Sequence, residues 1–212
     1  MGLSSCFEVG SLENSGEISV SATGGNAEGD YSGVYVFTGN PIWVDYSTVN
    51  NFTNTETGEI FAYGTGGDAI GYHSEVIMND FGVGFLGWVD NFSNAGLIET
   101  WVFAGDAEGE GSFVGIVPEW YPIYGVLFGG GLGSGVNSGD IFVWAAAGDA
   151  IGAGSEVVVY DVCGLIGMGE VDYLVNEGSI WVWAKAGDAV VEGGEDDLDA
   201  LMVEDGDSSS SV

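Results

Sequence analysis

Four aspartates at regular intervals are the residues of this chain whose type and spacing could do chemistry. Asp68, Asp106, Asp149 and Asp188 each stand between a glycine and an alanine, and successive members are 38 to 43 residues apart. If a repeated fold brings them into one column, their carboxylates could bind Ca²⁺, a hard cation that prefers oxygen ligands in flexible geometry. The alternative is structural, because Gly-Asp-Ala is an ordinary turn sequence, and Asn26 fills the same position without a charge.

The other reactive side chains give little support for catalysis. His73 is the only histidine, the single basic residue is Lys185, and no serine or cysteine is marked out as a nucleophile beside the histidine. Cys6 and Cys163 fall in distant repeats and should lie too far apart for a disulfide bond. A pair of carboxylates could still hydrolyse a glycosidic bond. We nevertheless expect a protein that is not an enzyme and has no cofactor apart from possible Ca²⁺.

The charge balance limits the partners of the chain. The sequence has 33 acidic residues against one basic residue, a formal net charge of −32. No basic surface that neutralises phosphates can be built from it, which excludes nucleic-acid binding. Anionic membranes would repel it, and we expect no membrane insertion. Such a surface either solvates an extracellular or high-salt protein or binds cations.

The aspartates belong to a repeat that occurs five times. Each copy carries Gly-Asp-Ala or Gly-Asn-Ala, with a glycine ten residues and an isoleucine eight residues before the acidic position. Four copies also carry a valine eight residues after it. The isoleucines are Ile18, Ile60, Ile98, Ile141 and Ile180, and the valines are Val34, Val76, Val114 and Val157. A period of about 40 residues is typical of solenoids, propellers and arrays.

The pattern within each copy indicates β-strands. Ile180 and Val182 alternate with Trp181 and Trp183, a period of two. The 39 glycines oppose helices and suit tight corners. Propeller blades need hairpins, whose two-residue turn sequences are scarce here. The sequence therefore predicts an all-β parallel β-helix, or β-solenoid, of five repeats of about 40 residues, with the isoleucines and the valines in two inward columns.

An asparagine recurs two residues before the first glycine of four copies, and Glu56 is the exception. Stacked asparagines can form a ladder of side-chain hydrogen bonds along a solenoid. The predicted ladder contains Asn14, Asn94, Asn137 and Asn176. A unit could be one large coil or two coils of about 20 residues, and the further apolar stretches 85–89, 124–128 and 165–168 favour two.

These repeats resemble a known style. Asn137-Ser138-Gly139-Asp140-Ile141 and Asn14-Ser15-Gly16-Glu17-Ile18, each followed by Gly-Asp/Asn-Ala, are similar to repeats of bacterial autotransporter passenger domains and filamentous-haemagglutinin-type adhesins. The resemblance covers about residues 14–191 and concerns the repeat style. It implies an extracellular right-handed β-helix at a cell surface. Those proteins have a secretion signal and usually a translocating module, and neither is visible in this sequence.

The division of the chain and its expected role follow from these patterns. We expect an N-terminal cap over residues 1–13, a β-solenoid over 14–191 and an acidic C-terminal cap or tail over 192–212. Outward tryptophans either stack on the coil or mark contact with a partner, a glycan or another copy. The leading expectation is a structural or adhesive β-solenoid that self-associates into fibres or a surface layer. The alternative is a Ca²⁺- or glycan-binding module, and the third is a polysaccharide-active β-helix enzyme.

Overall fold

The computed structural model describes residues 3–5, 8–117 and 121–191. The predicted acidic cap or tail and Cys6 lie outside these ranges. Within them the chain forms strands and turns, and no helix long and apolar enough to cross a membrane occurs there.

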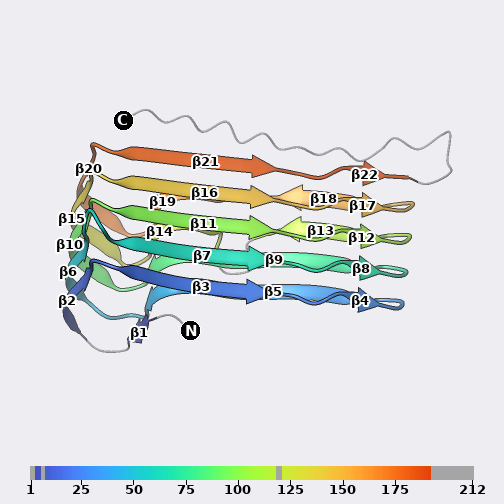
Figure 1. Cartoon of the computed structure of the whole chain (residues 1–212), viewed down its shortest axis with the longest axis horizontal. Coiled ribbons are helices and arrows are strands. Elements are labelled where there is room, and N and C mark those ends of the chain that lie inside the picture. Colours follow the sequence, from blue (N-terminus) through green and yellow to red (C-terminus); the bar gives the residue numbers. More distant parts are fainter. Residues whose placement is uncertain (1–2, 6–7, 118–120, 192–212) are drawn as a thin grey trace.

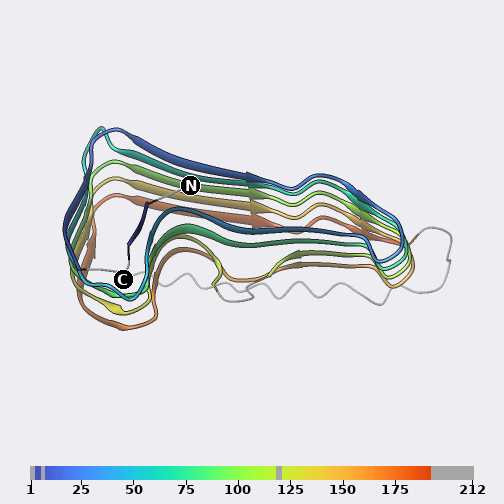
Figure 2. The ribbon, with the colours of Figure 1, turned by 90° about the horizontal axis from the view of Figure 1, so that it is seen from below.

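The chain winds through four parallel sheets in a constant order, and Figure 2 shows the resulting flattened coils. Sheet B contains β2 (Val9–Asn14), β6 (Val49–Asn54), β10 (Trp88–Asn94), β15 (Gly131–Asn137) and β20 (Glu170–Asn176). Sheet C follows with β3 (Glu17–Thr23), β7 (Glu59–Thr65), β11 (Leu97–Phe103), β16 (Asp140–Ala146) and β21 (Ser179–Lys185). Sheet D is the narrow edge, made of β4 (Ala27–Glu28), β8 (Ala69–Ile70), β12 (Ala107–Glu108), β17 (Ala150–Ile151) and β22 (Ala189–Val190).

Sheet A closes the first four coils. It contains β1 (Leu3–Ser5), β5 (Gly33–Val44), β9 (Glu75–Phe85), β13 (Phe113–Ile116), β14 (Ile123–Phe128), β18 (Glu156–Val159) and β19 (Val162–Gly167). All pairings are parallel and join equivalent positions of neighbouring repeats, so that Ile98 lies between Ile60 and Ile141. The predicted all-β parallel β-solenoid is therefore confirmed, with its coils stacked as Figure 1 shows.

Each repeat makes one coil, so the preference for two coils of about 20 residues was wrong. The stretch 124–128 lies in β14, where Val126 pairs with Val83 and Leu165 at a distance of one whole repeat. The stretches 85–89 and 165–168 likewise continue sheet A or enter sheet B. The reason is a bend in sheet A: β5 and β9 carry a register shift there, and in the next two coils the same path is divided into two strands.

The two predicted inward columns are confirmed. The three central isoleucines are fully buried, and those of the first and last coils, Ile18 and Ile180, pack against the same core cluster. The valine column is buried in the first three coils, and Val157 packs against a second cluster under sheets C, D and A. The first cluster also holds stacked phenylalanines, with Phe52 and Phe92 5.3 Å apart between ring centroids. Alternation at period two produces both clusters, because every second side chain of a strand points inward.

The asparagine ladder exists and is longer than predicted. Asn54 occupies the position that the sequence assigned to Glu56, because the turn of the second copy holds two extra residues before Gly58. Each Nδ2 donates to the Oδ1 of the next coil, over 2.9, 2.8, 2.7 and 2.7 Å along Asn14, Asn54, Asn94, Asn137 and Asn176. The ladder therefore has a direction, with its donors pointing toward the C-terminal coil.

Candidate functional site

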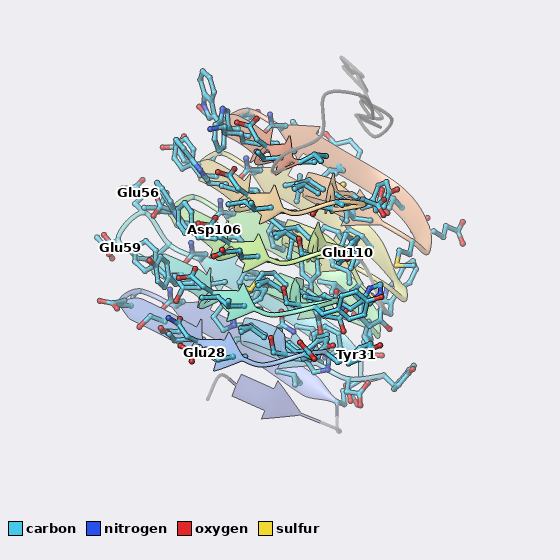
Figure 3. All side chains as sticks on the ribbon, turned by 90° about the vertical axis from the view of Figure 1, so that its right-hand side faces the viewer. Glu28, Tyr31, Glu56, Glu59, Asp106 and Glu110 are labelled. Carbon is cyan, nitrogen blue, oxygen red and sulfur yellow. The ribbon has the colours of Figure 1, made fainter. Side chains whose placement is uncertain are left out.

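The structure brings the four predicted aspartates together in one column at the turn between sheets C and D. The alanines that follow them pair in register from coil to coil, which fixes the column. Asn26 occupies the first position, as the sequence indicated. Figure 3 views this edge of the solenoid, where Glu28, Asp106 and Glu110 lie on the surface.

Each side chain of the column except the last, Asp188, accepts a backbone hydrogen bond from the coil above it. The N–H of Asp106 donates to Oδ1 of Asp68 over 3.1 Å, and the N–H of Asp149 donates to Oδ1 of Asp106 over 2.8 Å. Asn26 and the last pair of the column repeat the contact at 3.0 and 2.8 Å. The column thus has the structural turn role, although the bond goes to the neighbouring coil and not to the residue's own backbone.

The predicted Ca²⁺ site in Asp68, Asp106, Asp149 and Asp188 stays a prediction. Each coil supplies one carboxylate of the column, and one oxygen of it is already hydrogen bonded in three of the four cases. Among the residues that the structure describes, no three His, Cys, Asp or Glu side chains come close enough to hold a metal ion. No other described His, Cys, Asp or Glu side chains therefore join the aspartates of the column to form a metal site of three or more ligands.

A buried acid that the sequence analysis missed lies at the bend of sheet A. Asp80 has a left-handed backbone (φ 61°) and is 7% exposed. Its Oδ1 accepts hydrogen bonds from the Tyr124 hydroxyl at 3.1 Å and from Nδ2 of Asn40 at 3.3 Å. Burial raises the pKa of the Asp80 carboxyl, and the two donors offset part of this rise. Burial and the nearby Asp80 charge raise the pKa of Tyr124 well above its usual value.

The hydrogen bonds of Asp80 are those of a structural polar contact. Both partners of Asp80 come from neighbouring coils, so the hydrogen bonds join three coils where the register shifts.

The other reactive side chains lie elsewhere. His73 packs against Tyr31 and Tyr72 at the other edge of the solenoid, with ring centroids 5.6 and 4.1 Å away. Cys163 is a free thiol whose pKa burial raises, which lowers its reactivity at neutral pH. The structure thus leaves these reactive groups apart.

The outer face of sheet C carries a continuous aromatic column. Tyr63, Trp101, Trp144 and Trp183 are in register on successive strands. Trp101 and Trp144 stack at 5.2 Å with an interplanar angle of 6°, and Trp183 follows at 4.2 Å. These tryptophans point outward, opposite the inward isoleucine column, as the alternation predicted. Because the rings of Trp101 and Trp144 cover each other's faces and the tilted ring of Trp183 lies close to Trp144, the three tryptophans resemble a stack along the solenoid more than a row of open faces for sugars.

The two end coils expose side chains that the inner coils bury. On β21, Val182 is 44% exposed, whereas Val143 at the same position of the coil below is 2% exposed. On β20, Val171 is exposed and its counterpart Leu132 is fully buried, and Leu174 is exposed where its counterpart Gly135 is buried. Trp181 is 65% exposed. The last described coil therefore presents an apolar edge with unpaired strands.

No model of a known protein family matches the chain, and no curated protein or solved structure matches it. The parallel β-solenoid agrees with the repeat style that the sequence resembles. Membership of the autotransporter or haemagglutinin-type families remains a prediction from that resemblance.

Proposed function

We propose that this chain is a non-enzymatic structural β-solenoid that self-associates through its end coils into fibres or a surface layer. The carrying observation is the open edge of the last described coil, where Val171, Leu174 and Val182 are 37 to 44% exposed. Unpaired strand edges and exposed core positions favour addition of another strand layer. An extracellular or cell-surface location and an adhesive role rest on the resemblance of the repeats alone.

The charge of the chain controls this association. With a net charge of −32, two copies repel one another at low ionic strength. Screening shortens the range of this repulsion to roughly 10 Å at 0.1 M salt and about 3 Å at 1 M. Contact between end coils is short-ranged and apolar, so it survives the salt that removes the repulsion. We therefore expect monomers at low salt and neutral pH, and assemblies at high salt or near the sequence pI of 4.1.

The test is sedimentation of the full chain at low and high salt, with one variant at the end and a matched variant in the body. Val182→Glu places a carboxylate on the open edge. Ile70→Glu adds the same charge to the second coil at a side chain that is also 44% exposed. We expect high salt to assemble the wild type and Ile70→Glu, and to leave Val182→Glu monomeric. Equal behaviour of the two variants, or a wild type that stays monomeric at all salt concentrations, would remove the proposal.

A further inference from the structure

We propose that the copies join head to tail, with the first coil of one copy stacked on the last coil of the preceding copy in the register that already links the coils within the chain. This inference rests on the proposed self-association and names its geometry. Such a joint is heterologous and does not close, so it generates an open polymer. Four independent features of the end coils fit it.

The asparagine ladder has an open donor at one end and a free place for a donor at the other. Inside the stack, Asn137 uses its amide group twice, donating to Gly139 O and to Oδ1 of Asn176. Asn176 donates to Gly178 O, and the described residues offer its amide no second acceptor. At the opposite end, no asparagine of the described residues donates to Oδ1 of Asn14, and within this part of the chain the oxygen accepts only the N–H of Gly16. In the head-to-tail joint, Asn176 meets Asn14 of the next copy and the ladder continues.

The acidic column also continues without placing like charges together. Its last member, Asp188, has an exposed carboxylate and no coil above it among the described residues. The first position of the column holds Asn26, the one copy without a charge. Stacking brings the Asn26 backbone N–H of the next copy to the Asp188 carboxylate, the contact that every inner coil makes. The proposed joint thus gives a physical reason why the first repeat has Asn26 where the other repeats have aspartate.

Side-chain size is complementary between the two edges. The register of sheet C puts Trp181 over Ser19 and Trp183 over Ser21 of the next copy, so two large exposed rings meet two small residues. The inward positions match by type, since Ile180 meets Ile18, Val182 meets Val20, and Leu174 meets Leu12 in sheet B. The joint therefore buries apolar side chains at positions that are core elsewhere in the stack.

The short strand β1 fits the same arrangement. It pairs with β5 below the first full coil, with Leu3 in register with Ile42. On the last level, the described residues supply strands to sheets B, C and D but none to sheet A, where β19 is the outermost strand. When copies stack in register, β1 of the next copy lies beside β19 and completes that level.

Joints between like ends fit poorly. Two C-terminal edges would place the Asn176 amide donors against each other and Asp188 carboxylates of both copies at one interface. Like charges in contact and unpaired donors are both unfavourable. The same edges would also bring Trp181 of one copy against large side chains of the other, without the serines that accommodate it.

Single-cysteine cross-linking of the full chain tests the joint. In a background of Cys6→Ser and Cys163→Ser, one protein carries Ser11→Cys and the other carries Tyr173→Cys. Both side chains are exposed, and the register of sheet B places them opposite each other only across the proposed joint. Neighbouring strands lie about 5 Å apart, within reach of a disulfide bond.

At high salt under mild oxidation, the mixture should give at least about tenfold more covalent dimer than either variant alone, equivalent to a preference of about 1.4 kcal/mol. The matched control is Ser134→Cys, in the same column but inside the stack, which should give no dimer with Ser11→Cys.

Three results would contradict these proposals. Like-with-like dimers in place of mixed ones would overturn the head-to-tail joint and leave self-association standing. A mixture that assembles by sedimentation without cross-linking would also overturn it, including the case in which residues 192–212 occupy the edge. Absence of assembly would refute the proposed function itself.

Discussion

Truncation of one rung of the asparagine ladder should destabilise the fold far more than truncation of a neighbouring exposed asparagine. Asn94 is fully buried, accepts from Asn54 at 2.8 Å and donates to Asn137 at 2.7 Å. In Asn94→Ala both bonds are lost, at about 1 kcal/mol each, and Oδ1 of Asn137 loses its ladder donor, at about 1 to 3 kcal/mol. Asn54 keeps its bonds to Gly58 O and Leu97 O, so it adds no further loss. The expected total is about 3 to 5 kcal/mol.

The matched control lies on the same strand. Asn91 forms an exposed ladder contact with Oδ1 of Asn51 at 3.2 Å, where water can replace either partner. Asn91→Ala should therefore cost less than about 0.5 kcal/mol. Urea unfolding at neutral pH and low salt, where the chain is expected to be monomeric, measures both variants, and neither substitution changes the net charge. A difference of less than about 1 kcal/mol between them would show that the buried ladder contributes little and refute this reasoning.

Ile141→Ala should lower the free energy of unfolding by about 2 to 5 kcal/mol as a buried truncation, and a loss below about 1 kcal/mol would show that the column is not core. Gly139→Ala should cost about 1 to 3 kcal/mol, because its Cβ would meet the Gly96 carbonyl of the coil below, while Gly10→Ala, with open space around it, should change little. Asp80 has a raised pKa when folded, so its contribution to stability falls as pH rises through the window above its ordinary pKa. Asp80→Asn should therefore be more stable than the wild type near pH 7, with an advantage that shrinks as pH is lowered through that window; a constant difference would count against the buried carboxylate. If the aspartate column chelates Ca²⁺, millimolar Ca²⁺ should promote assembly more strongly than monovalent salt at matched ionic strength, and an equal effect would reduce it to screening.

Most of the fold could be predicted from the sequence, because the repeat period and the alternation of apolar side chains follow directly from how the strands pack. Ile60 and Val76 were placed in the core from their spacing alone, and the aspartates were placed in one column. The size of the coil was misjudged because short apolar stretches carry no signal for which strand they pair with. Only the bend of sheet A, where β9 and β14 shift register, shows that they extend one long coil.

The missed features have local causes. Asn54 was overlooked because two extra turn residues displace it from the repeat position, although its side chain reaches the same site in space. Asp80 has no counterpart in the repeat, and its burial depends on Asn40 and Tyr124 from two other coils. The apolar edge of the last coil appears only when the residues above it are considered, since Val182 has the same sequence pattern as buried Val143. The sequence pattern therefore predicts which side chains point inward, but the exposure of each one also depends on whether another coil covers it.

The axial repeat of assemblies formed at high salt tests the central claim most directly. Sheets B, C and D each have five strands, and strands in a sheet are spaced by 4.7 to 4.9 Å. In-register end-to-end stacking therefore predicts unbranched fibres with one copy about every 24 Å along the axis, measurable by electron cryo-microscopy of the full chain. Fibres with this repeat would establish a polymer built through the end coils. Amorphous precipitate, or monomers that persist when the charge is screened, would contradict the account.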